Sequence, residues 1–177
     1  DPLISRAVTK DLELECGFDA GLPDQLRGDP IRLRQVIGGL VGNAIKFTDQ
    51  GYVQLRVSRV ESAKEGPVRL RFSVRDTGTG ISQERQDGLF RPQLLGDGAA
   101  ASSDSTGLGL AIARQLVEMM GGEIDFESSP SVGSQFWFTT LFAQPSQVSG
   151  AVGPGDVTGV RVLVIQRSQT TTRRRPL

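Results

Sequence analysis

The chain has 177 residues, of which 37% are hydrophobic and 23% charged, a composition that suits one packed domain of ordinary size with a tail. The 20 basic and 20 acidic residues cancel, which argues against a nucleic-acid partner. With one cysteine, no histidine and no apolar run near ~18 residues, the sequence excludes an internal disulfide, a histidine-ligated metal, a serine–histidine relay and a membrane-spanning helix within it.

The first predicted elements are the end of a helix, a strand and a long helix. Residues 1–10 are typical of a helix end, and residues 11–18 alternate in polarity like a half-buried strand. A turn-rich segment then leads to Asp29 and Pro30, where aspartate can cap a helix and proline can occupy its first position. Apolar residues recur at helical spacing from there to about Thr48.

The middle of the chain predicts a mixture of strands and helices. In chain order we expect strands at 52–60 and 68–76, a glycine turn at 77–80, a short helix near 82–90, a loop at 94–106, a helix over 107–120, and a hairpin of strands 123–128 and 134–142. No internal repeat is present in the sequence.

The composition changes after residue 142. Residues 143–159 are rich in Gln, Pro, Ser, Gly and Val, which is typical of a linker, and residues 160–166 predict a buried strand. Because one strand does not fold alone, we expect residues 160–177 to begin a truncated second domain after the domain at 1–142.

The first candidate group is Asn43 with Lys46, which share one face of the long helix with Gly39. An amide oxygen can ligate a hard cation, and a nearby ammonium can neutralise phosphate. The alternative is an ordinary solvated helix end.

The second candidate group is the segment from Asp76 to Ile81, in which a strand ends in a carboxylate followed by Gly78 and Gly80. An aspartate there can accept a hydrogen bond from the amino group of a base, and the glycines allow a close backbone approach. The alternative is a tight glycine turn that the aspartate caps.

The third candidate group is the segment 105–110 (STGLGL), which leads directly into a predicted helix. Free amides at a helix start can bind phosphate. The segment is neither a dinucleotide fingerprint nor a Walker loop, because no strand comes just before it, no third glycine has the right spacing, and no GK[ST] follows. The alternative is a glycine-rich helix entry.

In this order and spacing, the residues resemble the catalytic domain of sensor histidine kinases, within the wider GHKL or Bergerat-fold ATPase superfamily. Residues 32–51 (RLRQVIGGLVGNAIKFTDQG) look like the family's N box, 74–81 (VRDTGTGI) like its G1 box, 89–92 (LFRP) like its F box, and 105–112 (STGLGLAI) like its G2 box. Residues 116–142 look like the closing helix and hairpin, so the resemblance covers about residues 7–142.

The resemblance implies an α/β (α+β) two-layer sandwich, in which a mixed, mostly antiparallel sheet packs on helices and ATP lies between loops of the two layers. Asn43 would ligate Mg²⁺, Lys46 would contact phosphate and Asp76 would accept the adenine amino group. Residues 93–106 would form the ATP lid. The remaining nucleotide-binding positions would be Gly78, Gly80, Ile81, Thr106, Gly107, Leu108, Gly109 and, as a weaker candidate near adenine, Thr139.

The implied function is to bind Mg·ATP and transfer its γ-phosphoryl group to a histidine on a separate dimerisation and phosphoacceptor domain, in two-component signalling. The expected partners are that domain and a downstream response regulator, in a homodimeric full-length protein. The domain would be cytoplasmic, in a bacterial parent protein compatible with an inner-membrane anchor. Residues 160–177 are similar to the start of a receiver domain, as in hybrid kinases, with Gln166 and Arg167 replacing the usual acidic pair.

Some positions depart from the family's pattern. Gly39 stands where hydrolysing relatives have a water-activating glutamate, so ATPase activity of the topoisomerase type is not expected. Gln93 replaces a usual aromatic residue, and residues 94–104 contain no lysine or arginine to neutralise the γ-phosphate. The alternative function is therefore a degenerate kinase module that regulates another sensor kinase by contact, with weak or no ATP turnover.

Overall fold

A computed structural model describes residues 2–60, 66–91, 108–144 and 162–164 of the chain. Its helices are α1 (Pro2–Thr9), α2 (Pro30–Phe47), α3 (Gln83–Gln86) and α4 (Leu108–Met119). Its strands are β1 (Glu13–Phe18), β2 (Gln25–Arg27), β3 (Tyr52–Arg59), β4 (Val68–Asp76), β5 (Ile124–Ser129), β6 (Gly133–Phe142) and β7 (Val162–Val164). No helix among the described residues is both long enough and apolar enough to cross a membrane.

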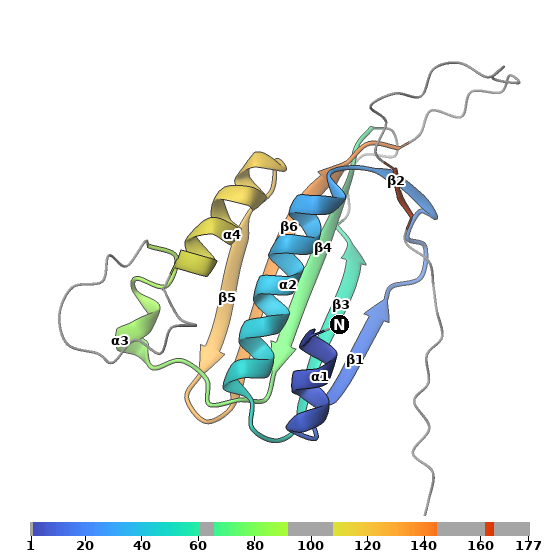
Figure 1. Cartoon of the computed structure of the whole chain (residues 1–177). Coiled ribbons are helices and arrows are strands. Elements are labelled where there is room, and N and C mark those ends of the chain that lie inside the picture. Colours follow the sequence, from blue (N-terminus) through green and yellow to red (C-terminus); the bar gives the residue numbers. More distant parts are fainter. Residues whose placement is uncertain (1, 61–65, 92–107, 145–161, 165–177) are drawn as a thin grey trace, which may run out of the picture.

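The principal sheet has five strands in the order β1-β3-β4-β6-β5. β1 is parallel to β3, and the other neighbouring pairs are antiparallel. Helices α1, α2 and α4 lie together on one face of this sheet (Figure 1). The predicted two-layer sandwich with a mixed, mostly antiparallel sheet is therefore confirmed.

The core lies between α2 and the inner face of the sheet. The burial of β4 alternates with period two, and its buried residues are Val68, Leu70, Phe72, Val74 and finally Asp76. On the opposite side of the core, α2 contributes the buried side chains Leu33, Val36, Leu40, Ala44 and Ile45. Because Asp76 continues this alternation at the end of β4, its carboxylate lies on the same inner face as the buried apolar residues.

The start of α2 agrees with the sequence prediction. The Oδ1 atom of Asp29 accepts hydrogen bonds from the backbone N–H groups of Ile31 and Arg32, at 3.0 and 3.2 Å, and Pro30 is the first helical residue. This capping fixes where the helix begins and therefore which of its residues face the core.

Residues 25–27 do not form the turn that the sequence suggested. They form β2, which pairs antiparallel with β7, and Arg27 also bridges to Ala143. Three residues are too few to show a periodic pattern, and their pairing partners come from the other end of the chain. The short helix expected near 82–90 is confined to α3, and the loop predicted at 94–106 lies outside the described residues.

Candidate functional site

The candidate site lies at the end of the sheet where β4 terminates, which is the lower end in Figure 1. Three segments meet there: the C-terminal turn of α2, the turn between β5 and β6, and residues 76–81, called the base loop below. The backbone N–H of Thr79 donates to the carbonyl of Phe47 at 3.2 Å, and the N–H of Ser131 donates to the carbonyl of Thr79 at 2.8 Å. The base loop is therefore attached to both neighbouring segments.

The carboxylate of Asp76 is held by two backbone donors. Its Oδ1 atom accepts from the N–H of Gly78 at 2.9 Å and from the N–H of Ser134 at 3.2 Å. The first of these bonds closes a turn, so the capping role that the sequence left open as an alternative is realised. The second bond joins the base loop to β6, whose Ser134 is paired with Asp76 in the sheet.

The second oxygen of this carboxylate is available to a ligand. Asp76 is only 7% exposed, and both of its hydrogen bonds use Oδ1. No fully buried side-chain oxygen of the described residues lacks a partner, so Oδ2 must retain access to the surface. Burial raises the pKa of Asp76, while the hydrogen bonds from Gly78 and Ser134 lower it. The site therefore presents one oriented acceptor oxygen in a largely desolvated position.

Glycine is required in the base loop because the loop lies against other backbone. A Cβ atom on Gly78 would overlap the carbonyl oxygen of Phe47 and would lie 3.0 Å from Oγ1 of Thr48. Gly80 has φ +66°, and a Cβ there would overlap the backbone of Ser129. The close approach that these glycines permit is thus made, at least in part, to the protein itself.

Two serines of the β5–β6 hairpin, Ser128 and Ser134, support the base loop, and no sequence pattern predicted either. The backbone N–H of Ile81 donates to Oγ of Ser128 at 2.8 Å. That hydroxyl also lies 3.1 Å from the carbonyl of Gly133 and 3.0 Å from Oγ of Ser134. The role of both serines depends on the register of the β5–β6 hairpin, which no local pattern reveals.

On the helix side, Asn43 and Lys46 are both half-buried on α2, and Gly39 lies exposed one turn earlier. The ammonium of Lys46 lies 5.4 Å from the centroid of the Phe47 ring. Asn43 is one helical turn, about 6 Å, before Phe47, the residue that receives the base loop. The base loop is thereby connected to Asn43 and Lys46, because the Phe47 carbonyl that it contacts belongs to the same helical turn.

The described residues contain no cluster of three or more acidic, histidine or cysteine side chains that could hold a metal ion by themselves. A lone amide oxygen at Asn43 suits Mg²⁺ in its usual protein setting, where phosphate oxygens and water complete the shell. The donor set thus fits an ion that arrives with a nucleotide rather than a resident metal.

The structure does not bring Thr139 to this site, contrary to expectation. Thr139 lies five positions along β6 from Ser134, about 17 Å, and on the opposite face of the sheet, because five is an odd number of residues. Its hydroxyl accepts instead from Arg69 at 3.2 Å and from the N–H of Glu123 at 3.3 Å. On β6, Ser134 reaches the base loop through its backbone bond to Asp76.

The third candidate group is described only in part. Leu108 and Gly109 form the exposed first turn of α4, and Thr106 and Gly107 lie outside the described residues. A Cβ on Gly109 would meet none of the described residues within 4 Å, so none of them crowds this side of the first turn of α4. This is compatible with an anion at the helix start.

The fold and its motifs match known proteins. A profile of the family described as histidine kinase-, DNA gyrase B- and HSP90-like ATPase matches residues 28–144. The sensory/regulatory protein RpfC of Xanthomonas campestris pv. campestris is 45% identical over 139 residues, 77% of this chain and 19% of that protein. The signal transduction histidine-protein kinase BarA of Escherichia coli is 42% identical over 130 residues, 73% of this chain and 14% of that protein.

Solved structures agree with these matches. Full-length ShkA, crystallised in complex with AMPPNP, superposes with a TM-score of 0.65 at 35% identity, over 80% of this chain and 28% of ShkA. The catalytic domain of the histidine kinase ThkA superposes with a TM-score of 0.60 at 24% identity, over 79% of this chain and 86% of that domain, and supports the fold alone. The chain spans less than a fifth of the length of RpfC and of BarA.

Proposed function

Because the chain belongs to the family of histidine kinase-, DNA gyrase B- and HSP90-like ATPases, we propose that it binds Mg·ATP and serves as the catalytic domain of a sensor histidine kinase. The observation that carries this proposal is the Asp76 carboxylate, with one oxygen fixed by two backbone donors and the other open to a ligand. The similarity to RpfC and BarA supports a role in two-component signalling.

In this proposal Asp76 recognises the base. Its open oxygen accepts a hydrogen bond from the exocyclic amino group of adenine, and its mostly buried position makes that bond stronger than one formed in water. Gly78, Gly80 and Ile81 keep the base loop against α2 and the β5–β6 turn, so the acceptor is in place before the nucleotide arrives. Little ordering is then required on binding.

Asn43 and Lys46 take the metal and the phosphates. The amide oxygen of Asn43 contributes one ligand to Mg²⁺, and the ammonium of Lys46 neutralises phosphate charge. The backbone amides of Thr106 and Gly107, which precede α4 in the sequence, and those of Leu108 and Gly109 provide further phosphate donors. When bound, Mg²⁺ supplies charge neutralisation at the phosphate oxygens.

Phosphoryl transfer then relies on positioning and charge rather than on covalent catalysis. The bond between the γ-phosphorus and its bridging oxygen breaks, its electron pair leaves with ADP, and an imidazole nitrogen forms the new P–N bond. The chain contains no histidine, so the acceptor belongs to another segment or subunit. The proposed downstream partner is a response regulator. The domain itself is proposed to be cytoplasmic, as part of a homodimeric parent protein that is anchored in the membrane.

A titration with ATP, with Mg²⁺ or with EDTA, tests the binding part. We expect Mg²⁺ to tighten ATP binding at least ~tenfold in the wild type, and Asn43→Ala to remove that difference because it deletes the metal ligand. Gln35→Ala, an exposed position two turns earlier on α2, is the matched control and should keep it. ATP affinity in the wild type that is the same with and without Mg²⁺ would contradict the metal assignment.

The alternative, a regulatory module with little turnover, is favoured by the absence of lysine and arginine in residues 94–104. Full-length protein incubated with Mg·ATP separates the two functions. Acid-labile phosphate on the protein supports the kinase. If the wild type is not phosphorylated but a variant with an arginine in residues 94–104 is, the result supports the regulatory module. The wild type would then lack only the positive charge that neutralises the γ-phosphate.

A further inference from the structure

Lys10 lies outside all three candidate groups, yet its side chain reaches the candidate site. It follows α1 directly, and its backbone N–H donates to the carbonyls of Arg6 and Ala7, both at 3.2 Å. The next residue, Asp11, has φ +53°, which turns the chain towards β1. The Lys10 backbone is therefore held in a closed helix end, and its side chain extends from there towards α2.

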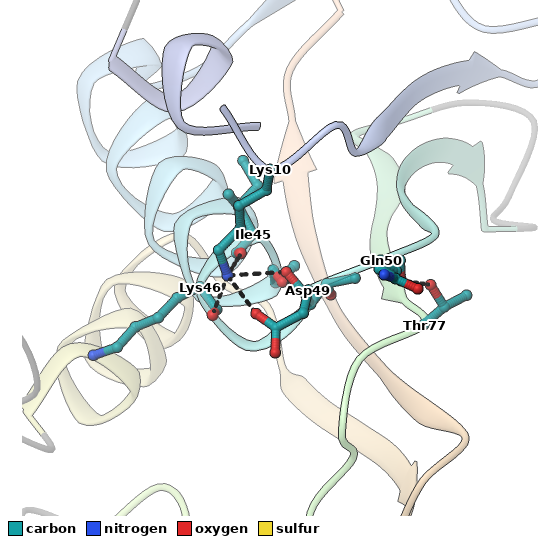
Figure 2. A network of polar contacts seen from close by, with 8 residues as sticks. Lys10, Ile45, Lys46, Asp49, Gln50 and Thr77 are labelled. Atoms are coloured by element: carbon teal, nitrogen blue, oxygen red, sulfur yellow. Dashed lines mark hydrogen bonds and ion pairs between the residues drawn. The ribbon is translucent and has the colours of Figure 1, made fainter. Parts of the chain in front are cut away.

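The ammonium of Lys10 is surrounded by oxygen atoms of α2 and the residues that follow it, as Figure 2 shows. It donates to the carbonyls of Ile45 at 3.1 Å, Lys46 at 2.9 Å and Thr48 at 3.0 Å, and it lies 3.0 Å from Oδ1 of Asp49. An ammonium has three N–H bonds, so these four acceptors use its full donor capacity.

The oxygens that Lys10 contacts are those that a helix leaves without partners. The last carbonyls of a helix have no intrahelical donor, and the aligned peptide dipoles give this end a partial negative charge. The carbonyl of Ala44 accepts from the N–H and the hydroxyl of Thr48, and the carbonyl of Phe47 accepts from Thr79. All five carbonyls from 44 to 48 are thus bonded, three of them to Lys10.

Lys10 and the base loop therefore hold the same helical turn. That turn carries Lys46, and Asn43 lies just before it. In Figure 2 the side chain of Lys46 points away from the carbonyls, so its backbone is held while its ammonium remains directed elsewhere. Asp49 is 85% exposed, so the ion pair itself contributes little and the carbonyl bonds dominate.

We propose that Lys10 is a positioning residue, which fixes the last turn of α2 and thereby the side chains of Asn43 and Lys46 relative to the base loop. The inference rests on the proposed function for its effect on nucleotide binding. Without the ammonium, the carbonyls of Ile45, Lys46 and Thr48 lose their donor at once, and the turn frays. The metal and phosphate ligands then lose their fixed geometry, although neither is itself altered.

Lys10→Met tests this inference, because it keeps an unbranched apolar stem and removes the charge and donors. We expect the Kd for Mg·ATP to rise about tenfold, equivalent to ~1.4 kcal/mol. In the nucleotide-free protein, hydrogen exchange at the amides of Thr48 and Thr79 should accelerate at least ~tenfold, since their acceptors belong to the loosened turn. The amide of Ser134, bonded to Asp76, should keep its exchange rate.

Arg56→Met is the matched control. It also replaces a cation with methionine and breaks an ion pair, to Asp19 at 2.8 Å, but on the face of the sheet opposite to the buried Val57. It should change neither the Kd nor the two exchange rates. A rescue uses Lys10→Cys in a Cys16→Ser background: alkylation with 2-bromoethylamine rebuilds a lysine-like ammonium and should restore both, whereas alkylation with iodoethane should not.

Unchanged exchange at Thr48 and Thr79 in Lys10→Met would overturn the inference. A wild-type protein that does not bind Mg·ATP would contradict the proposed function instead, and the exchange rates would still decide whether Lys10 positions the helix end. Faster exchange without any change in Kd would show that the loosened turn is irrelevant to the nucleotide, and would also overturn the inference.

Discussion

The two halves of the site are held in place by different means. The base loop is fixed by a network spread over the sheet, in which Ser134 bonds to Asp76 and Ser128 bonds to Ile81. Asn43 and Lys46 lie on a single helix, and three carbonyls at its end accept from one side chain, that of Lys10, which follows α1. Changes within the base loop should therefore affect folding and base recognition together. Binding by Asn43 and Lys46 should instead be sensitive to substitution of Lys10, a residue that contacts no ligand itself.

The largest effect is expected for Gly78→Ala. The new methyl group overlaps the backbone carbonyl of Phe47, which cannot move aside as a flexible side chain could. We expect the free energy of unfolding to fall by about 3 kcal/mol, measured by urea denaturation. Gly88→Ala is the control, because a Cβ there meets no atom of the described part of the chain within 4 Å. Equal losses for the two variants would show that the base loop is not tightly packed.

A smaller effect is expected for Ser128→Ala. The hydroxyl of Ser128 accepts from the N–H of Ile81, which then loses its partner in a half-buried position. The free energy of unfolding should fall by ~1–2 kcal/mol, again by denaturation. Ser131→Ala, on the exposed β5–β6 turn, provides the comparison and should cost less. If Ser131→Ala costs as much, the hydroxyl of Ser128 is not a special support of the base loop.

The pH dependence of ATP binding should reflect the environment of Asp76. Burial raises the pKa of its carboxyl, and only the ionised form lets one oxygen accept from adenine while Oδ1 accepts from Gly78 and Ser134. ATP affinity should therefore decline as pH falls, starting above the pH at which an ordinary aspartate protonates, and Asp76→Asn should remove this decline. Calorimetric titrations of the wild type and of Asp76→Asn between pH 7 and 4.5 measure this decline in ATP affinity. An equal decline in the two proteins would mean that another group titrates.

The same shift has the opposite sign for stability. A raised folded-state pKa means that the contribution of Asp76 is fully present below the unfolded-state pKa and is lost as pH rises through the folded-state pKa. Asp76→Asn should therefore gain stability relative to the wild type as pH rises from 4 to 7. A lower pH should thus increase the contribution of Asp76 to the free energy of unfolding, while it weakens nucleotide binding.

The smallest effect is expected for Asp49→Asn. Its carboxylate is 85% exposed, so loss of the ion pair with Lys10 should change the Kd for Mg·ATP less than twofold, or ~0.4 kcal/mol. Comparison with Lys10→Met on the same titration separates the ion pair from the carbonyl bonds. An effect of Asp49→Asn as large as that of Lys10→Met would mean that the ion pair, not the helix end, matters.

Much of the fold followed from local chemistry. The cap at Asp29, the period-two burial of β4 and the carboxylate at its end are properties of short segments, and the structure agrees with each. The strand β2 was missed because its three residues gain their hydrogen bonds from residues far along the chain. Propensity alone cannot report such pairing.

The site was only partly predictable for the same reason. Asp76 is marked by its place between a strand and two glycines, whereas Ser128 and Ser134 gain their roles only from hairpin register. Thr139 was misplaced because an odd offset along β6 reverses the face of the sheet. Lys10 lies 35 residues or more from the carbonyls that it contacts, so no sequence window contains both.

Recognition of ATP by this protein depends, in the proposed function, on a hydrogen bond from the amino group of adenine to the open oxygen of Asp76. This dependence is tested most directly by competition of ATP against GTP on the wild type and on Asp76→Asn, in Mg²⁺. Guanine places a carbonyl where adenine has its amino group, so the wild type should prefer ATP at least ~30-fold, about 2 kcal/mol, and the variant should lose that preference. Equal affinities of the wild type for the two nucleotides would contradict the claim.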